Sequence, residues 1–283
     1  MCIGLFDADI FMYRAASAAE HIYYSVYPLS EPYERIGEEF ASHKEMKAFV
    51  EKELRKKVTD FEVVKRKEVK PVFQAKMIID QMINTVIKAT GISESVFFLS
   101  DAKNFRHRLA VTKPYKDRTA EKPEHYQAMK DYLIGKYNAV ILKDLEADDA
   151  LAIWAEQCDK YNIPCVINSD DKDLRQIPTM HYNVRTGVLD HVHILPALRR
   201  FFKQVMTGDP TDSIPGLPGV GDKSPYVLSI DQSTEISAMT AIVRKAYIEN
   251  KKLDVPDRMV YLNEQANLIY LRRHPNEGVS FDE

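Results

Sequence analysis

The sequence predicts an α/β fold in which a central, mostly parallel sheet is flanked by helices. Short apolar stretches typical of buried strands run directly into acidic turns, as in LFDAD, FFLSD and VINSD. In residues 139–158, and again in residues 163–177, a helical pattern follows the acidic turn. This repeated order of strand, turn and helix is typical of a parallel sheet, whose carboxyl strand ends share one edge. We therefore expect the acidic turns to meet at that edge.

The remaining elements are predicted from the same periodicities. Alternating or continuous apolar patterns indicate strands at residues 2–6, 21–29, 60–69 and 95–101. A helical period indicates helices at residues 10–21, 40–58 and 72–90, the last of them ended by Gly91. Residues 180–195 are predicted to form a hairpin that turns at Thr186-Gly187, and the chain is mostly helical from about residue 197.

Composition limits the class of protein. The chain has 283 residues, of which 45% are hydrophobic, so it can form a large core and is not disordered. The net charge is -3 at pH 7, whereas a protein that binds polyanions over much of its surface is usually basic. Three cysteines without a Cys-x-x-Cys pair argue against a disulfide framework and indicate a reducing compartment. Neither a signal-peptide pattern nor an apolar run long enough to span a bilayer is expected.

Acidic side chains are concentrated in five short stretches. They are Asp7 and Asp9, Asp101, Glu146 with Asp148 and Asp149, Asp171 and Asp173, and Asp209 and Asp212. Singly, the acids of the first stretch are explained as helix caps and Asp101 as a turn residue. The three acids within residues 146–149 exceed what one helix cap needs. Carboxylates held together repel one another, so we expect them to bind Mg²⁺ or Mn²⁺, which prefer oxygen ligands. Two such ions would serve phosphodiester cleavage.

Residues 103–122 form a basic stretch that Pro114 interrupts. Its cations are Lys103, Arg106, Arg108, Lys113, Lys116, Arg118 and Lys122. A solvated surface explains such a run equally well on its own. Beside a metal site, however, these side chains could hold phosphates, and Tyr115 could stack on a base.

A glycine-rich segment follows the last acidic stretch. In GLPGVGDKSP, Gly219 and Gly221 permit a tight turn whose backbone amides could face a phosphate, and a helix near Lys223 would add its dipole. The residue order differs from that of a Walker A loop, so binding of a nucleoside triphosphate is not expected.

The ordered set of these motifs resembles the flap-endonuclease/5′→3′ exonuclease family, in particular the bacteriophage enzymes and the 5′-nuclease domain of bacterial DNA polymerase. The motifs are DADIFMYR, FFLSD, PYKDR, EADDALA, SDDKDL and GDPTDSIPGLPGVGDKS. The resemblance implies a two-metal site. Glu146, Asp148 and Asp171 resemble the tighter site, with Asp7 and Asp101 nearby. Asp173, Asp209 and Asp212 resemble the second site, and Asp149 matches a further acid of the phage members.

The family resemblance also implies an arch and a duplex grip. Lys116 and Arg118 resemble the phosphate-steering pair of the arch, although the chain reads Tyr-Lys-Asp-Arg where the family pattern is Tyr-Lys-x-Asn-Arg. Residues 216–223 resemble a helix–three-turn–helix that holds duplex DNA, often with a potassium ion. The DNA-binding residues expected from both regions are Arg106, Tyr115, Gly216, Gly219, Gly221 and Lys223.

Together these patterns predict a Mg²⁺-dependent 5′-nuclease that acts on DNA at 5′ ends or flaps, with RNA primers as a further candidate substrate. We expect a monomer in the cytoplasm, or in the host cytoplasm if the source is a phage. The predicted domains are a nuclease core, residues 1–200, with an arch at about 103–125 and an insertion at about 23–70, and a helical duplex-binding region, residues 201–283. The alternatives are a phosphohydrolase of the HAD type that uses Asp7, and a non-catalytic DNA-binding module.

Overall fold

The computed structural model describes residues 2–117 and 121–282, which fall into two compact units. The first unit consists of Met1–Phe11, Met82–Glu121 and Leu133–Glu283, and the second consists of Met12–Gln81 and Lys122–Tyr132. The C-terminal helices therefore share a unit with the N-terminal strand. The boundary predicted at residue 200 stays a prediction.

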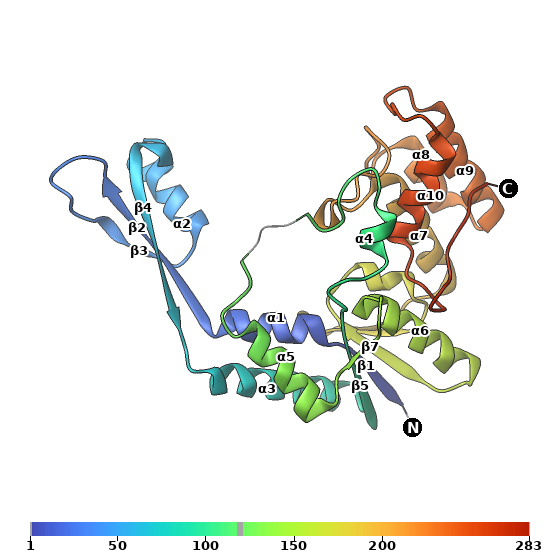
Figure 1. Ribbon diagram of the computed structural model, residues 1–283, viewed down its shortest axis with the longest axis horizontal. Helices are drawn as coiled ribbons and strands as arrows, with labels where there is room; N and C mark the ends of the chain where they lie inside the picture. Colours follow the sequence, from blue (N-terminus) through green and yellow to red (C-terminus); the bar gives the residue numbers. More distant parts are fainter. Residues whose placement is uncertain (1, 118–120, 283) are drawn as a thin grey trace. The chain divides into compact units, whose positions relative to one another are not determined.

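The first unit is built on a six-stranded sheet with the order β6-β5-β1-β7-β8-β9 (Figure 1). Its strands are β1 (Ile3–Asp7), β5 (Glu94–Leu99), β6 (Val140–Ile141), β7 (Cys165–Ser169), β8 (Met180–Asn183) and β9 (Leu189–His191). Every neighbouring pair is parallel except β8 and β9, which form the predicted hairpin. The predicted mostly parallel α/β sheet is confirmed.

Helices cover both faces of this sheet, as the alternating side chains of β5 demonstrate. Phe98 packs against Trp154 of α6 (Ala147–Lys160), with ring centroids 5.7 Å apart. Phe97 points to the other face and contacts Phe6 and Tyr137. Because successive strand residues face opposite sides, a strand buried on both faces must be continuously apolar, as ESVFFL nearly is.

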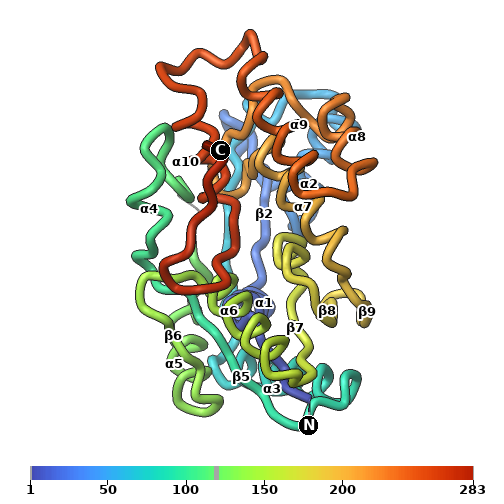
Figure 2. Tube along the Cα trace, turned by 90° about the vertical axis from the view of Figure 1, so that its right-hand side faces the viewer, coloured from blue at the N-terminus to red at the C-terminus, as the bar shows by residue number. Residues whose placement is uncertain are grey.

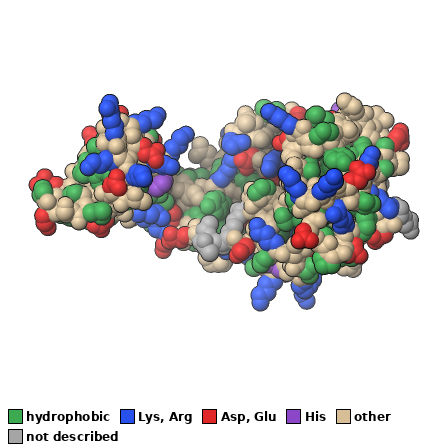
Figure 3. All heavy atoms as spheres, turned by 90° about the horizontal axis from the view of Figure 1, so that it is seen from above, with side chains coloured by type: hydrophobic (Ala, Val, Ile, Leu, Met, Phe, Trp, Pro, Cys, Tyr) green, Lys and Arg blue, Asp and Glu red, His purple; other side chains and the backbone are tan. Residues whose placement is uncertain are grey.

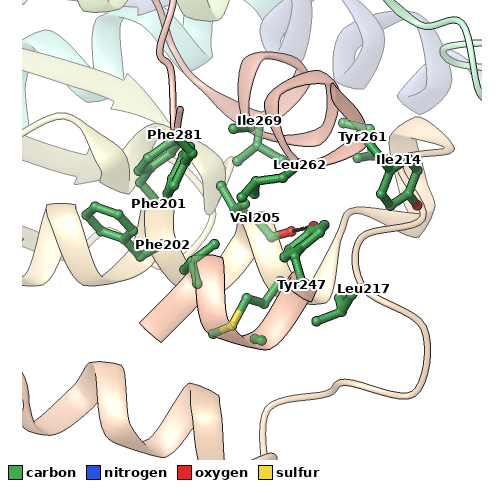
Figure 4. Packing of buried hydrophobic residues seen from close by; sticks show 14 of the residues in the cluster. Phe201, Phe202, Val205, Ile214, Leu217, Tyr247, Tyr261, Leu262, Ile269 and Phe281 are labelled. Carbon is green, nitrogen blue, oxygen red and sulfur yellow. Dashed lines mark hydrogen bonds between the residues drawn. The ribbon is translucent and has the colours of Figure 1, made fainter. Parts of the chain in front are cut away.

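The C-terminal helices α7 (Ile194–Thr207), α8 (Pro225–Gln232), α9 (Ile236–Glu249) and α10 (Arg258–Ile269) enclose a second apolar core. In Figure 4 the side chains of α7, α9 and α10 meet, and the Tyr247 hydroxyl donates to the carbonyl of Val205 at 2.6 Å. The Tyr247 side chain is completely buried, so this hydrogen bond gives its hydroxyl group the partner that water cannot provide. The core fixes α7 beside the turn that carries Asp209 and Asp212.

The second unit contains a three-stranded antiparallel sheet with the order β3-β2-β4. Its strands are β2 (Glu20–Pro28), β3 (Ile36–Phe40) and β4 (Phe61–Val69), and α2 (His43–Ala48) packs on one face through Met46. Three further helices contain residues of both units: α1 (Ala8–Ala18), α3 (Val72–Thr90) and α5 (Tyr126–Tyr137). The predicted insertion at 23–70 lies within the second unit.

Two predicted helices are wrong in extent. Residues 40–58 do not form one helix, because β3 includes Phe40, Ser42 caps α2 by accepting from the amide of Glu45, and Arg55 has a left-handed φ of 52°. The segment that follows β7 forms only the 3₁₀ turn Asp173–Gln176. Pro178 accounts for this short length, since the residue before a proline avoids the helical conformation.

Charges of both signs are interspersed on the surface, as Figure 3 illustrates for one face. This mixture agrees with the small net charge of -3. Within the described part of the chain, no helix has the length and apolar character needed to cross a membrane.

Candidate active site

The carboxyl ends of β1 and β7 bring two of the acidic stretches together, those that contain Asp7 and Asp171. Asp7 is the last residue of β1, and its Oδ2 accepts a hydrogen bond of 2.8 Å from Ser169 Oγ at the end of β7. The same serine oxygen accepts from the backbone amide of Asp171 at 3.0 Å. One hydroxyl thus links two of the predicted ligands across adjacent parallel strands.

The acids near the end of β5 are held by backbone amides. Asp9 accepts from the amide of Ser100 at 3.1 Å. Asp101 accepts from the amide of Asp144 at 2.9 Å and from that of Lys103 at 3.3 Å. Asp101 therefore joins the loops that follow β5 and β6, a structural role that accounts for this acid without a metal.

Burial and mutual repulsion disfavour the ionised form of two carboxyl groups in the site, those of Asp7 and Asp148. Burial, followed by the charges of Asp9 and Asp171, raises the pKa of Asp7 to about 7. Burial, followed by the charges of Asp171 and Asp7, raises the pKa of Asp148 well above its usual range. Carboxylates in this condition bind a proton or a cation readily, because either one relieves the repulsion.

Glu146 and Asp149, at the start of α6, have a different environment, because protein cations neutralise them. Arg106, which is 2% exposed, contacts Asp149 through two nitrogens at 2.5 and 2.9 Å and Glu146 at 3.4 Å. Asp149 also accepts from the amides of Glu146 and Arg272. With four donors around its two oxygens, Asp149 serves the fold, and its position is at odds with the predicted role as a metal ligand.

Lys116 and Tyr115 lie against the acids instead of extending into solvent. The Lys116 ammonium is 2.7 Å from Glu146 Oε1 and 3.6 Å from Asp212 Oδ2. The Tyr115 hydroxyl is 2.8 Å from Glu146 Oε2 and 2.9 Å from Asp212 Oδ2. Burial raises the pKa of Glu146, but Arg106 and Lys116 outweigh it, so the pKa is lowered overall. Lys116 is thus a cation that contacts these carboxylates and still remains partly exposed, at 38% of its side chain.

The third group of acids lies between the turn after β7 and the C-terminal helices. Arg200 and Gln204 of α7 both donate to Asp173 Oδ1, at 2.7 and 2.6 Å. Asp209 caps the turn Pro210–Asp212 by accepting from the amide of Thr211. Burial, followed by the charge of Asp171, raises the pKa of Asp173 to about 6.

A small cavity of about 30 Å³ connects these groups. Five carboxylates line it: Glu146, Asp148, Asp173, Asp209 and Asp212. Since a cavity needs roughly 10–15 Å³ to hold one water, this space is large enough for two or three water-sized occupants. The sheet edge and the C-terminal helices thus contribute to one acidic hollow.

The donor chemistry of this hollow fits a hard divalent cation. The candidate ligand atoms of its acids are all oxygens, and the pKa values of Asp148 and Asp173 stay raised although Lys116 and Arg200 lower them in part. In the described residues, no three His, Cys, Asp or Glu side chains are arranged as a ready metal-binding group. Binding would therefore require the carboxylates to turn toward the ion.

The predicted DNA-binding residues fall into two classes. Arg106, Tyr115 and Gly216 are buried, which is at odds with a direct DNA contact. Gly216 instead packs against Gly208, since a Cβ on it would lie 2.3 Å from the Gly208 nitrogen. The exposed class consists of Gly219, Gly221 and Lys223. Arg118 lies outside the described residues.

Several residues that complete the site were missed by sequence reasoning. Ser169, Asn104, Arg200 and Gln204 orient acids, and nothing in their spacing distinguishes them from ordinary polar residues. Lys252 was also missed, although its ammonium lies next to Gly219, within 3.1 Å of where a Cβ would be. Its location after α9 gave no signal that it belongs to the glycine turn.

Comparison with known proteins gives a match over just above half of the chain. Residues 51–200 match the model of the 5′-3′ exonuclease N-terminal resolvase-like domain. Similar curated proteins include a DNA polymerase I of Rhizobium leguminosarum (30% identical over 155 residues, 50% of this chain and 15% of that one). A 5′-3′ exonuclease of Buchnera aphidicola is 32% identical over 148 residues, 47% of this chain and 48% of its own. The chain thus matches less than half the length of these two relatives.

One further relative and one solved structure extend the match. The flap endonuclease Xni of Pseudoalteromonas translucida is 27% identical over 206 residues, which cover 65% of this chain and 78% of that protein. The T5 D15 protein co-crystallised with metal ions has a similar fold, with a TM-score of 0.52. That alignment has 13% identity and covers 95% of this chain and 86% of the other.

Proposed function

This chain belongs to the family of the 5′-3′ exonuclease N-terminal resolvase-like domain, and on that premise we propose that it is a metal-dependent 5′-nuclease. It would hydrolyse DNA phosphodiesters from 5′ ends or at 5′ flaps, and would accept RNA primers as well. The observation that carries the proposal is the 30 Å³ hollow lined by five carboxylates, beside which Lys116 remains partly exposed.

Asp148, Asp173, Asp209 and Asp212 are the residues that would hold Mg²⁺ or Mn²⁺ in the hollow, with Asp7 and Asp171 at the adjoining sheet edge. Two such ions would stabilise the negative charge that develops on the phosphate and lower the pKa of the attacking water. Without bound cations the negative charge of the carboxylates would repel the phosphate of DNA, so we expect cleavage to require the metal ions.

Lys116 has a separate task in this proposal. Its ammonium is held at the rim by Glu146 and Asp212, and burial of the group is outweighed by these two charges, so its pKa is raised and it stays positive. A fixed positive charge at this point would hold the scissile phosphate against the acidic hollow.

The exposed turn from Gly219 to Lys223, with Lys252 beside it, would grip duplex DNA through backbone amides and the two ammonium groups. We propose that the carbonyl groups of this turn also bind a potassium ion. We further propose that the protein is a monomer, that it acts on RNA–DNA hybrids as well, and that it works in the cytoplasm, or in the host cytoplasm if it is a phage protein. Arg118 keeps its proposed role as a second phosphate contact.

Cleavage of 5′-labelled flap, nicked and blunt duplexes tests the proposal. With MgCl₂ we expect products whose lengths separate exonuclease from flap cleavage, and with EDTA we expect none. Asp148→Ala and Asp171→Ala should abolish cleavage and leave DNA binding largely intact, whereas the exposed control Asp131→Asn should cleave normally. Cleavage that resists EDTA, or normal turnover by either alanine variant, would reject the mechanism.

The same assay separates the two alternatives. A phosphohydrolase that uses Asp7 would release phosphate from small monoesters, and its turnover would not depend on a DNA end. A non-catalytic module would bind flap DNA without any product at any metal concentration. Neither alternative accounts for the acidic lining contributed by Asp209 and Asp212.

A further inference from the structure

A pair of histidines lies outside the acidic hollow, where β9 leads into α7. His191 is the last residue of β9, and His193 is the residue before α7. Val192 between them is buried, whereas both histidines are exposed. Because side chains alternate along extended chain, a His-x-His sequence with a buried centre presents both imidazoles on the same side.

The two rings are close enough to share an ion. Their Nδ1 atoms are 3.2 Å apart, and the ring centroids are 4.4 Å apart. Two imidazole nitrogens that bind one zinc ion at about 2.0–2.1 Å in tetrahedral geometry lie roughly 3.3–3.4 Å apart. The observed separation is nearly that of a chelating pair.

Two carboxylates line the same hollow as the histidines. The histidines line an open hollow of about 480 Å³ together with Glu156, Asp159 and Arg273. Glu156 and Asp159 are three residues apart on α6, so they project from the same side of that helix. Figure 2 displays β8, β9 and the start of α7 side by side, and the hairpin register confirms the pairing of the strands.

We propose that His191 and His193 chelate a borderline transition-metal ion, Zn²⁺ by preference, with a carboxylate of α6 as the third ligand. Two nitrogens and one or two carboxylate oxygens suit zinc, whereas magnesium prefers an all-oxygen set. The described residues form no ready three-ligand group here, so the third ligand is recruited when Glu156 or Asp159 turns toward the ion. The bound ion ties α6 to the connection between β9 and α7, and it is independent of the proposed nuclease site.

Calorimetry with ZnCl₂ tests this site. The full chain is stripped with EDTA and returned to buffer with excess MgCl₂, so that magnesium competes for the all-oxygen hollow. We expect a single zinc ion per chain and a higher melting temperature of the wild type in its presence. His191→Gln and His193→Gln should each weaken zinc binding about tenfold or more and remove the gain in melting temperature. Circular dichroism of each variant verifies its fold.

His43→Gln is the matched control, because His43 is also exposed but lies in the other compact unit. It should bind zinc as the wild type does. The double variant Glu156→Gln/Asp159→Asn should also bind more weakly, which tests the third ligand. The proposal is overturned if the wild type takes up no zinc, or if both histidine variants bind zinc as the wild type does, which is the result expected if cysteines held the ion. It is also overturned if His43→Gln loses as much zinc affinity as the His191 and His193 variants.

Discussion

Arg106 provides the sharpest test of the structure, because its guanidinium donates hydrogen bonds to the start of α6 and to the end of α10 at once. It binds Asp149 through two nitrogens, and it donates to the carbonyl groups of Leu268 and Tyr270 at the end of α10, both at 2.9 Å. Arg106→Met keeps most of the volume but removes the charge. It leaves the Asp149 carboxylate, which is 0% exposed, without its cation, and it leaves two helix-end carbonyl groups without a donor. Breaking a buried ion pair in this way costs about 3–5 kcal/mol.

Arg108 is the matched control, since it lies two residues further along the same short helix, α4 (Arg106–Leu109), and also binds an aspartate through two nitrogens. Its bonds to Asp144 are 2.7 and 2.5 Å, but its side chain is 67% exposed. An exposed, solvent-screened pair contributes little to stability, so Arg108→Met should leave the free energy of unfolding nearly unchanged.

Urea unfolding followed by tryptophan fluorescence measures both variants. The chain has a single tryptophan, Trp154, which packs on Phe98 in the same compact unit as Arg106. Asp149→Asn added to Arg106→Met should recover part of the loss, because it removes the unpaired charge, with a coupling of about 0.5–3 kcal/mol. If Arg106→Met costs no more than Arg108→Met, or if the second substitution recovers nothing, the reasoning about the buried network is refuted.

Three further predictions concern catalysis, DNA binding and pH. Lys116→Ala should slow single-turnover cleavage by about 10²-fold or more while changing duplex affinity little, because its ammonium contacts Glu146 and Asp212 of the acidic hollow. Lys113→Ala, at an exposed position, is the control, and an unchanged rate for Lys116→Ala would show that Lys116 takes no part in cleavage. Lys223→Ala should weaken duplex binding and reduce the slope of log affinity against log salt by about 1, so a slope equal to that of the wild type would exclude a phosphate contact. Burial lowers the pKa of His181 from 6.5 to about 4, so the neutral ring stabilises the fold above pH 6.5 and this stability is lost as the pH falls toward 4. Relative to His181→Gln, the wild type should lose up to about 3 kcal/mol of unfolding free energy over that range, and parallel stability curves for the two proteins would contradict the assignment.

The parallel sheet was predictable because its strands are short and continuously apolar, and because acidic turns mark their ends. The helix at 72–90 was predictable for a similar reason, since a strong helical period runs up to Gly91, which adopts φ 65°. The strand Ile36–Phe40 was not predictable, because IGEEF carries two charged residues and lies on an edge, where only its pairing with β2 makes it a strand.

Local sequence also failed where tertiary contacts decide the role of a residue. The run at 103–122 reads as one basic surface, yet the structure divides it. Arg106 is buried against Asp149, Arg108 is exposed, and Lys116 faces the acidic hollow. Their identical charge carries no information about which of them meets a carboxylate that is distant in the sequence.

The same limit applies to the acids, and it explains why the site could be located but not resolved into ligands. Glu146, Asp148 and Asp149 are almost adjacent in sequence, and charge counting treats them alike. On the helix, however, consecutive positions point about 100° apart, so one turn directs Asp149 inward to Arg106 and Asp148 to the hollow. The number of acids therefore overstates the charge that cations must balance, because Arg106 and Lys116 already neutralise part of it. The acids of the site whose pKa values remain raised, which include Asp7, Asp9, Asp148, Asp173 and Asp212, are the better guide to where a metal ion would bind.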